Sequence, residues 1–251
     1  NTPVSDTLVS DTSSRNIRSG PNTTKRDFSV THPGPDKPPS SSAPVRIYGG
    51  NETLYMDGQV ISEWSVITRK VVGGPQYLVT TMPLLTNPKG KEVTVGFLSH
   101  NEPVGTIVDY DEESLTVLIK LYPNVDFRNY SSTTPTIGLV WNISQLASGD
   151  DCIFYSDHKN GKYTSLKHLA VKATIRDGLG KTRVYNNLIE TELVSGKKGI
   201  LFSGNQTLFS DNTTAIGFLI GGTSSVSYFY PLSDVLNKFD IGLTESYRSK
   251  D

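Results

Sequence analysis

Histidine and cysteine are the residues of this sequence best suited to acid–base and nucleophilic chemistry, and it contains four histidines and one cysteine. His32 lies in a proline-rich segment, whereas His100 and His158 lie among turn-forming residues. We expect the latter two to be solvated turn residues and His168 to be a surface or edge residue of a strand. Whether a serine pairs with one of these imidazoles stays open on the sequence alone.

Cys152 follows two acidic residues at the start of a predicted strand. We expect a buried structural thiol there, because a nucleophilic cysteine needs a base beside it. A single cysteine also excludes an internal disulfide framework and a zinc site built from several thiolates.

Clustered carboxylates are the other candidates for chemistry, since paired acids serve metal sites and glycosidases. The clusters are Asp109/Asp111/Glu112/Glu113, Asp150/Asp151 and Glu190/Glu192. We expect solvated carboxylates in the first cluster, which falls in a predicted hairpin turn, and a solvent-facing pair in the last, which alternates along one strand. Without a nucleotide-binding glycine loop or a His-Glu-x-x-His motif, we expect no cofactor and no metal.

Charge and hydropathy argue against two classes of partner. The sequence has 24 Lys and Arg against 25 Asp and Glu, and a net charge of -1 does not favour nucleic acid. The apolar run at 215–220 is far shorter than the roughly 20 residues of a membrane span.

Asn-x-Ser/Thr triplets occur at Asn22, Asn51, Asn129, Asn142, Asn205 and Asn212. We attribute these triplets to chance in a Ser/Thr-rich chain, although glycosylation would imply secretion.

The sequence divides into an N-terminal tail and a body. Residues 1–45 hold seven of the 14 prolines, nine serines and one aromatic residue, Phe28. This segment, called the arm below, buries too little apolar surface to offset the cost of ordering it, so we expect it to be extended or disordered. Residues 46–251 read as all-β, because short β-branched and aromatic runs alternate with turn residues.

About a dozen strands without a long helix between them indicate a sandwich or a barrel. The one convincing helix, 231–239, places Leu232, Val235, Leu236 and Phe239 on one face. The predicted strands are 65–71, 77–81, 92–98, 105–110, 114–121, 137–141, 152–156, 168–175, 183–193, 199–203, 214–220 and 226–230.

Five segments, taken in order, resemble the chymotrypsin-like serine proteases. They are 77–85, similar to that family's LVTAAH strand end; 114–121, similar to its LDVALLKL strand; 195–201, similar to its GDSGGPL loop; 215–222, similar to its VVGIHSGG strand; and 231–236, similar to its closing helix. The resemblance implies an all-β fold, a chymotrypsin-like double β-barrel with a short C-terminal helix, preceded by the extended Pro/Ser-rich arm. The domains expected are the arm at 1–45, a first barrel at 46–135 and a second barrel with the helix at 136–251.

The same resemblance assigns positions to the catalytic residues of the family. The histidine slot holds Pro83, the aspartate slot Thr116 and the serine slot Lys198. Pro83 accepts no proton, Thr116 carries no charge to balance an imidazolium, and Lys198 has no hydroxyl. The resemblance therefore implies a pseudoprotease, a degenerate member of the fold that is not an enzyme.

The expected function is that of a non-catalytic structural or interaction protein. We expect a viral capsid-associated or surface-projecting protein on the virion surface, with residues 1–45 contacting a capsid or shell protein. A secreted pseudoprotease that binds another protein, and a hydrolase whose active site lies elsewhere, are the alternatives. Because the sequence begins with Asn1 and opens on no charged-then-apolar leader, we expect a processed product or a fragment of something longer, without a signal peptide.

Overall fold

The computed structural model describes the barrels and leaves the arm outside, apart from its last residue. The described residues are 45–48, 53–62, 65–69, 74–82, 87–97, 100–128, 137–140, 142–156, 161–176, 180–196, 198–204 and 213–243. The expected arm, like His32, His158 and Pro83, therefore lies outside the part of the chain that the structure describes.

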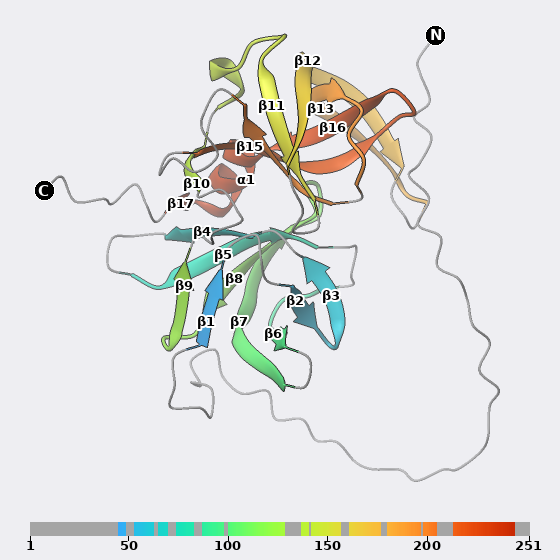
Figure 1. Cartoon of the computed structure of the whole chain (residues 1–251). Helices are drawn as coiled ribbons and strands as arrows, with labels where there is room; N and C mark the ends of the chain where they lie inside the picture. Colours follow the sequence, from blue (N-terminus) through green and yellow to red (C-terminus); the bar gives the residue numbers. More distant parts are fainter. Residues whose placement is uncertain are drawn as a thin grey trace, which may run out of the picture.

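The first barrel is an eight-stranded sheet in the order β17-β4-β5-β8-β7-β6-β2-β3 (Figure 1). Its strands are β2 (Leu54–Met56), β3 (Gln59–Ser62), β4 (Ser65–Arg69), β5 (Gln76–Thr81), β6 (Glu92–Phe97), β7 (His100–Asp111), β8 (Thr116–Leu121) and β17 (Gly242–Leu243). β8 is the central strand, and five of its six residues are buried. Because β17 pairs with β4, the chain returns to the first barrel after completing the second.

The second barrel is a seven-stranded sheet in the order β10-β15-β14-β11-β12-β13-β16, and an additional pairing of β15 with β16 closes it. Its elements are β10 (Ile137–Val140), the short helix η1 (Ile143–Gln145), β11 (Asp151–Tyr155), β12 (Lys162–Arg176), β13 (Thr182–Glu192), β14 (Ile200–Ser203), β15 (Thr213–Gly222), β16 (Val226–Pro231) and α1 (Leu232–Phe239). Its core contains the edge-to-face pair Phe154 and Phe229, with ring centroids 5.7 Å apart.

Helix α1 forms where proline fixes the first backbone angle and an apolar stripe follows. Pro231 is the N-cap, and Leu232, Val235, Leu236 and Phe239 are the buried residues of the helix. α1 lies on the side of the second barrel that faces the first (Figure 1). This position brings its last turn to the junction between the barrels.

A small separate sheet stands beside the first barrel. β1 (Val45–Tyr48) pairs in parallel with β9 (Val125–Arg128), and no other strand belongs to this two-stranded sheet in the described part of the chain. β1 is the point at which the arm joins the body.

The expected fold class is confirmed: the protein is an all-β double barrel with a short C-terminal helix. The predicted strand at 168–175 is part of the longer β12, which continues across register shifts in its pairing with β13. The expected division at residue 135 stays a prediction, although β17 shows that the first sheet also takes residues from the C-terminal part. No helix in the described segments is long and apolar enough to cross a membrane.

Candidate functional site

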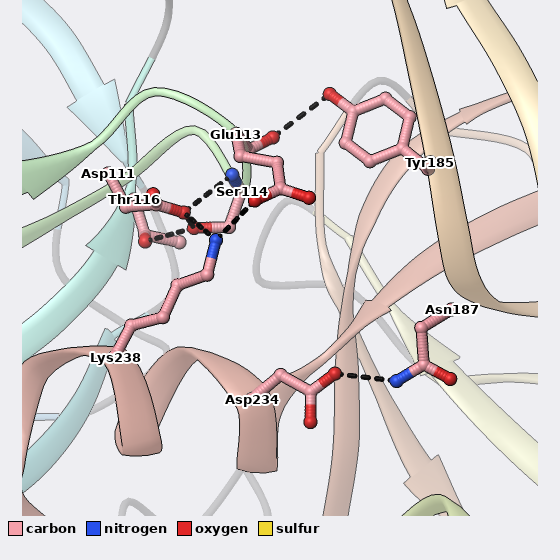
Figure 2. Close-up of polar contacts among 8 residues, drawn as sticks. All are labelled: Asp111, Glu113, Ser114, Thr116, Tyr185, Asn187, Asp234 and Lys238. Atoms are coloured by element: carbon pink, nitrogen blue, oxygen red, sulfur yellow. Dashed lines mark hydrogen bonds and ion pairs between the residues drawn. The ribbon is translucent and has the colours of Figure 1, made fainter.

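A charged cluster occupies the junction between the barrels (Figure 2). Lys238, in the last turn of α1, donates hydrogen bonds to Oδ2 of Asp111 at 3.0 Å and to Oε2 of Glu113 at 2.6 Å. Both carboxylates belong to the hairpin that joins β7 to β8 in the first barrel. One lysine therefore ties the helix of the second barrel to a turn of the first.

Two buried hydroxyls, those of Ser114 and Thr116, extend this cluster. The backbone N–H of Ser114 donates to Oδ2 of Asp111 at 2.8 Å, and the Ser114 hydroxyl contacts the same oxygen. Ser114 Oγ also lies 2.6 Å from Thr116 Oγ1. Thr116 is 1% exposed, so the residue that the resemblance assigns to the aspartate slot forms part of a buried hydroxyl pair.

Hydrogen bonding decides the protonation of the charged pair. Burial by itself would raise the pKa of Asp111, but hydrogen bonds from Ser114 and Lys238 outweigh it and lower that pKa. Burial would likewise lower the pKa of Lys238, but its bonds to Glu113, Tyr230 and Asp111 raise it. Both groups are therefore held in their charged forms, and Lys238 is not suited to act as a base.

Strand β13 contributes two neutral side chains to the same junction. The Tyr185 hydroxyl donates to the backbone carbonyl of Glu113 at 2.9 Å, and Asn187 donates to Asp234 of α1 at 2.7 Å (Figure 2). Tyr185 packs edge-to-face on Tyr230 at 6.2 Å between centroids. Contacts from α1, β13 and the β7–β8 turn therefore hold the two barrels together at this junction.

The loop before β14 contains Lys198, the residue that the resemblance assigns to the serine slot. Lys198 is half-buried and Lys197 lies outside the described residues. At Gly199, φ is +156°, and an added Cβ would lie 2.2 Å from the carbonyl oxygen of Tyr155, so only glycine fits there. Close by in sequence, Ser195 accepts a hydrogen bond from the ammonium of Lys162 on β12. The contact between Lys162 and Ser195 was not predicted from the sequence, because 33 residues separate them.

Cys152 is fully buried, and burial, with the nearby acids Asp150 and Asp151, raises the pKa of its thiol to about 12. This environment agrees with the structural thiol expected from the sequence. His100 is the first residue of β7 and pairs with Phe97 across the hairpin. No group of three or more His, Cys, Asp or Glu within the described segments is arranged to hold a metal ion.

His168 is exposed, and its Nδ1 lies 2.8 Å from Oε1 of Glu190 on the neighbouring strand. Glu190 also binds the hydroxyl of Tyr228, whose pKa is raised by burial and by this carboxylate. Glu190 and Glu192 therefore do not form the expected solvent-facing pair, because the carboxylate of Glu190 contacts side chains on the neighbouring strands.

The expectation of solvated carboxylates in the β7–β8 turn needs correction for one member. The side chain of Asp111 is only 21% exposed and carries the ion pair with Lys238. The turn itself was predicted correctly, but its partner lies 127 residues away. Nothing in the local sequence signals a contact over that separation.

Comparisons with known proteins identify the fold. No protein-family model and no curated protein matches the sequence. Among solved structures, the chain is similar to Nocardiopsis protease, with TM-score 0.55 and 15% identity over 79% of this chain and 99% of that one. It is similar to Thermobifida fusca protease A, with TM-score 0.51 and 18% identity over 79% and 98%, respectively. It also resembles Cellulomonas bogoriensis chymotrypsin, with TM-score 0.51 and 15% identity over 80% and 99%. The protein thus has the fold of the chymotrypsin-like serine proteases.

The expectation that the protein is not an enzyme is contradicted by this comparison, because the solved structures that share its fold are proteases. That expectation depended on the residues placed in the catalytic slots. Of these, Pro83 lies outside the described residues, and the positions of Thr116 and Lys198 do not show that activity is lost. At 15% and 18% identity, the likeness establishes the fold and leaves the activity to experiment.

Proposed function

We propose that this protein acts by binding another protein chain, and that one end of the ribbon formed by β12 and β13 is part of the contact. The observation that supports this proposal is the placement of exposed apolar side chains. Of the four large hydrophobic residues exposed in the described part of the chain, Tyr163 and Leu193 lie at the same end of this ribbon, whereas Val184 lies near its other end, opposite Thr174. Grouped exposed apolar residues commonly mark interaction sites.

The end of the ribbon where β12 begins and β13 ends has the composition of an interface. Tyr163 is 77% exposed and Leu193 51% exposed. Because Leu166 pairs with Thr191, both residues lie at this end. Lys162 and Ser195 add a charged and a polar group beside them. A large amphipathic tyrosine with an aliphatic neighbour and a polar rim is typical of residues that contribute strongly to protein binding.

The function is tested by the size of the complex that contains the protein in its source. The full chain should migrate in a density gradient with a larger complex, and Tyr163→Ser combined with Leu193→Ser should move it toward the position of the free chain. The matched control, Lys167→Ser with Lys172→Ser on the same ribbon, should leave migration unchanged. A wild-type chain that already migrates as free protein would contradict the proposal.

The class of partner that we propose is a capsid or shell protein, with the protein placed on the virion surface. The support is compositional: the Pro/Ser-rich arm has almost no core-forming residues, and such segments often bind along other molecules. Purified particles that lack the protein would contradict this partner class. Glycan mass at the Asn-x-Ser/Thr triplets would instead favour the secreted alternative.

A second candidate function is hydrolysis by a site other than the expected slots. The observation that favours it is the contact of Ser195 with Lys162, since serine and a lysine in its neutral amine form make the nucleophile–base pair of some hydrolases. A fluorophosphonate probe should then label the wild-type chain and lose at least about 90% of its labelling in Ser195→Ala, because a lost nucleophile removes nearly all chemistry. Ser225→Ala, at another exposed serine, should label normally. Equal labelling of both variants would exclude this site.

A further inference from the structure

Within the described segments, the strand partners of β1 all lie in one other strand. It pairs with β9 over four residues, in a two-stranded parallel sheet separate from both barrel sheets. Two-stranded sheets are marginal by themselves, and a short parallel pair contributes fewer contacts than a strand inside a barrel. The pairing of β1 therefore can open without breaking the strand ladder of either barrel.

The residue types that this register brings opposite each other are complementary. Arg46 is the partner of Asp126, Ile47 of Phe127 and Val45 of Val125. The residue types of the two strands agree with this register, because a shift by one residue would place the charged residue types opposite apolar ones in the sequence. β9 is therefore a specific acceptor for a strand with the sequence of β1.

We propose that β1 is exchanged between two copies of this chain, so that the β1 of each copy pairs with the β9 of the other. Every pairing of the closed form is reproduced in the exchanged form, which makes such exchange a low-cost route to dimers. Gly49 and Gly50 follow β1 directly in the sequence, and glycine restricts the backbone less than any other residue. The inference deepens the proposed function, because it names a second copy as one partner, but its test needs no other protein.

The charge pair provides a test in which only reciprocal exchange restores complementarity. In Arg46→Asp, the two register partners are both acidic, and in Asp126→Arg they are both basic. When the two full-length variants are mixed, exchange between them brings the introduced aspartate of one chain opposite the introduced arginine of the other. The same exchange brings the native Arg46 of the second chain opposite the native Asp126 of the first. Two like-charge pairs thereby become two opposite-charge pairs.

Native mass spectrometry of this mixture, after co-refolding at high protein concentration, should show a heterodimer fraction about tenfold above the homodimer fraction of either variant alone. The double variant, Arg46→Asp with Asp126→Arg, is the control for folding and should behave as wild type. A mixed spectrum that is only the sum of the two separate spectra would overturn the proposal.

A second measurement covers the case in which a charge variant fails to fold. Ile47→Cys on an unlabelled chain and Phe127→Cys on an isotopically heavy chain should be joined by a short bis-maleimide, while the buried Cys152 stays unmodified. The matched control is one chain that carries both cysteines, which should be crosslinked within itself in the closed form. If this control is crosslinked and the mixture gives no product of one unlabelled and one heavy chain, the exchange is overturned. If exchange fails but the Tyr163 and Leu193 variant still leaves the large complex, the proposed function stands without it.

Discussion

Replacing Phe229 by alanine should lower the free energy of unfolding by about 3–5 kcal/mol, the range found for large aromatic residues in protein cores. Phe229 is fully buried on β16, between β13 and β15, and packs edge-to-face on Phe154. The cavity would open where the second barrel closes on itself. Because small domains have a total stability of about 5–15 kcal/mol, urea unfolding should show a strongly shifted midpoint or an unfolded chain.

Tyr163→Ala is the matched control for this prediction. It also truncates an aromatic residue of the second barrel, but one that is 77% exposed. Its free energy of unfolding should stay within about 0.5 kcal/mol of wild type. A loss for Phe229→Ala no larger than that of the control would contradict the packing described for the second barrel.

Replacing Lys238 by methionine should destabilise the protein by about 1–2 kcal/mol, below the range for fully buried ion pairs because the lysine side chain is 33% exposed. The substitution keeps the length of the side chain and leaves Asp111 and Glu113 without their shared cation. Lys172→Met, at an exposed position of β12, is the matched control and should have little effect.

The pH dependence of this loss distinguishes the ion pair from packing. The pKa of Asp111 is lowered in the folded protein, so its stabilisation is present above the ordinary aspartate value and is lost as pH falls through the folded pKa. The pKa of Lys238 is raised, so its stabilisation is present below the ordinary lysine value and is lost as pH rises through the folded pKa.

The difference in unfolding free energy between wild type and Lys238→Met should therefore be largest between about pH 5 and pH 9 and shrink on either side. Urea titrations at several pH values measure it. A difference that is constant with pH would show that the lysine acts by packing alone.

Much of the fold was predictable because strand order and turn chemistry are local signals. The helix at 231–239 was readable from its apolar stripe, and the structure has it at Leu232–Phe239. β1 and β9 were not predicted, because their pairing joins segments about 80 residues apart and each strand has only four residues. β17, with two residues, carries no periodic pattern at all.

The candidate site was less predictable than the fold. Asp111 was singled out only as part of an acidic turn, and the cation that organises it comes from α1, far along the chain. Ser195 and Lys162 meet only because β12 and the end of β13 lie side by side. The mistaken exclusion of catalysis has a related cause: substitutions read from short aligned motifs say which residues fill the slots, and they cannot place the other groups of a site in space.

Photo-crosslinking from position 163 in the natural source tests protein binding by the second barrel. Benzoylphenylalanine in place of Tyr163 should give one discrete adduct with a single partner protein, and Leu193→Ser in the same chain should abolish it. The same crosslinker in place of Asp57, exposed on the first barrel, should give none. Absence of a discrete adduct from position 163, or the same adducts from both positions, would contradict recognition by this surface.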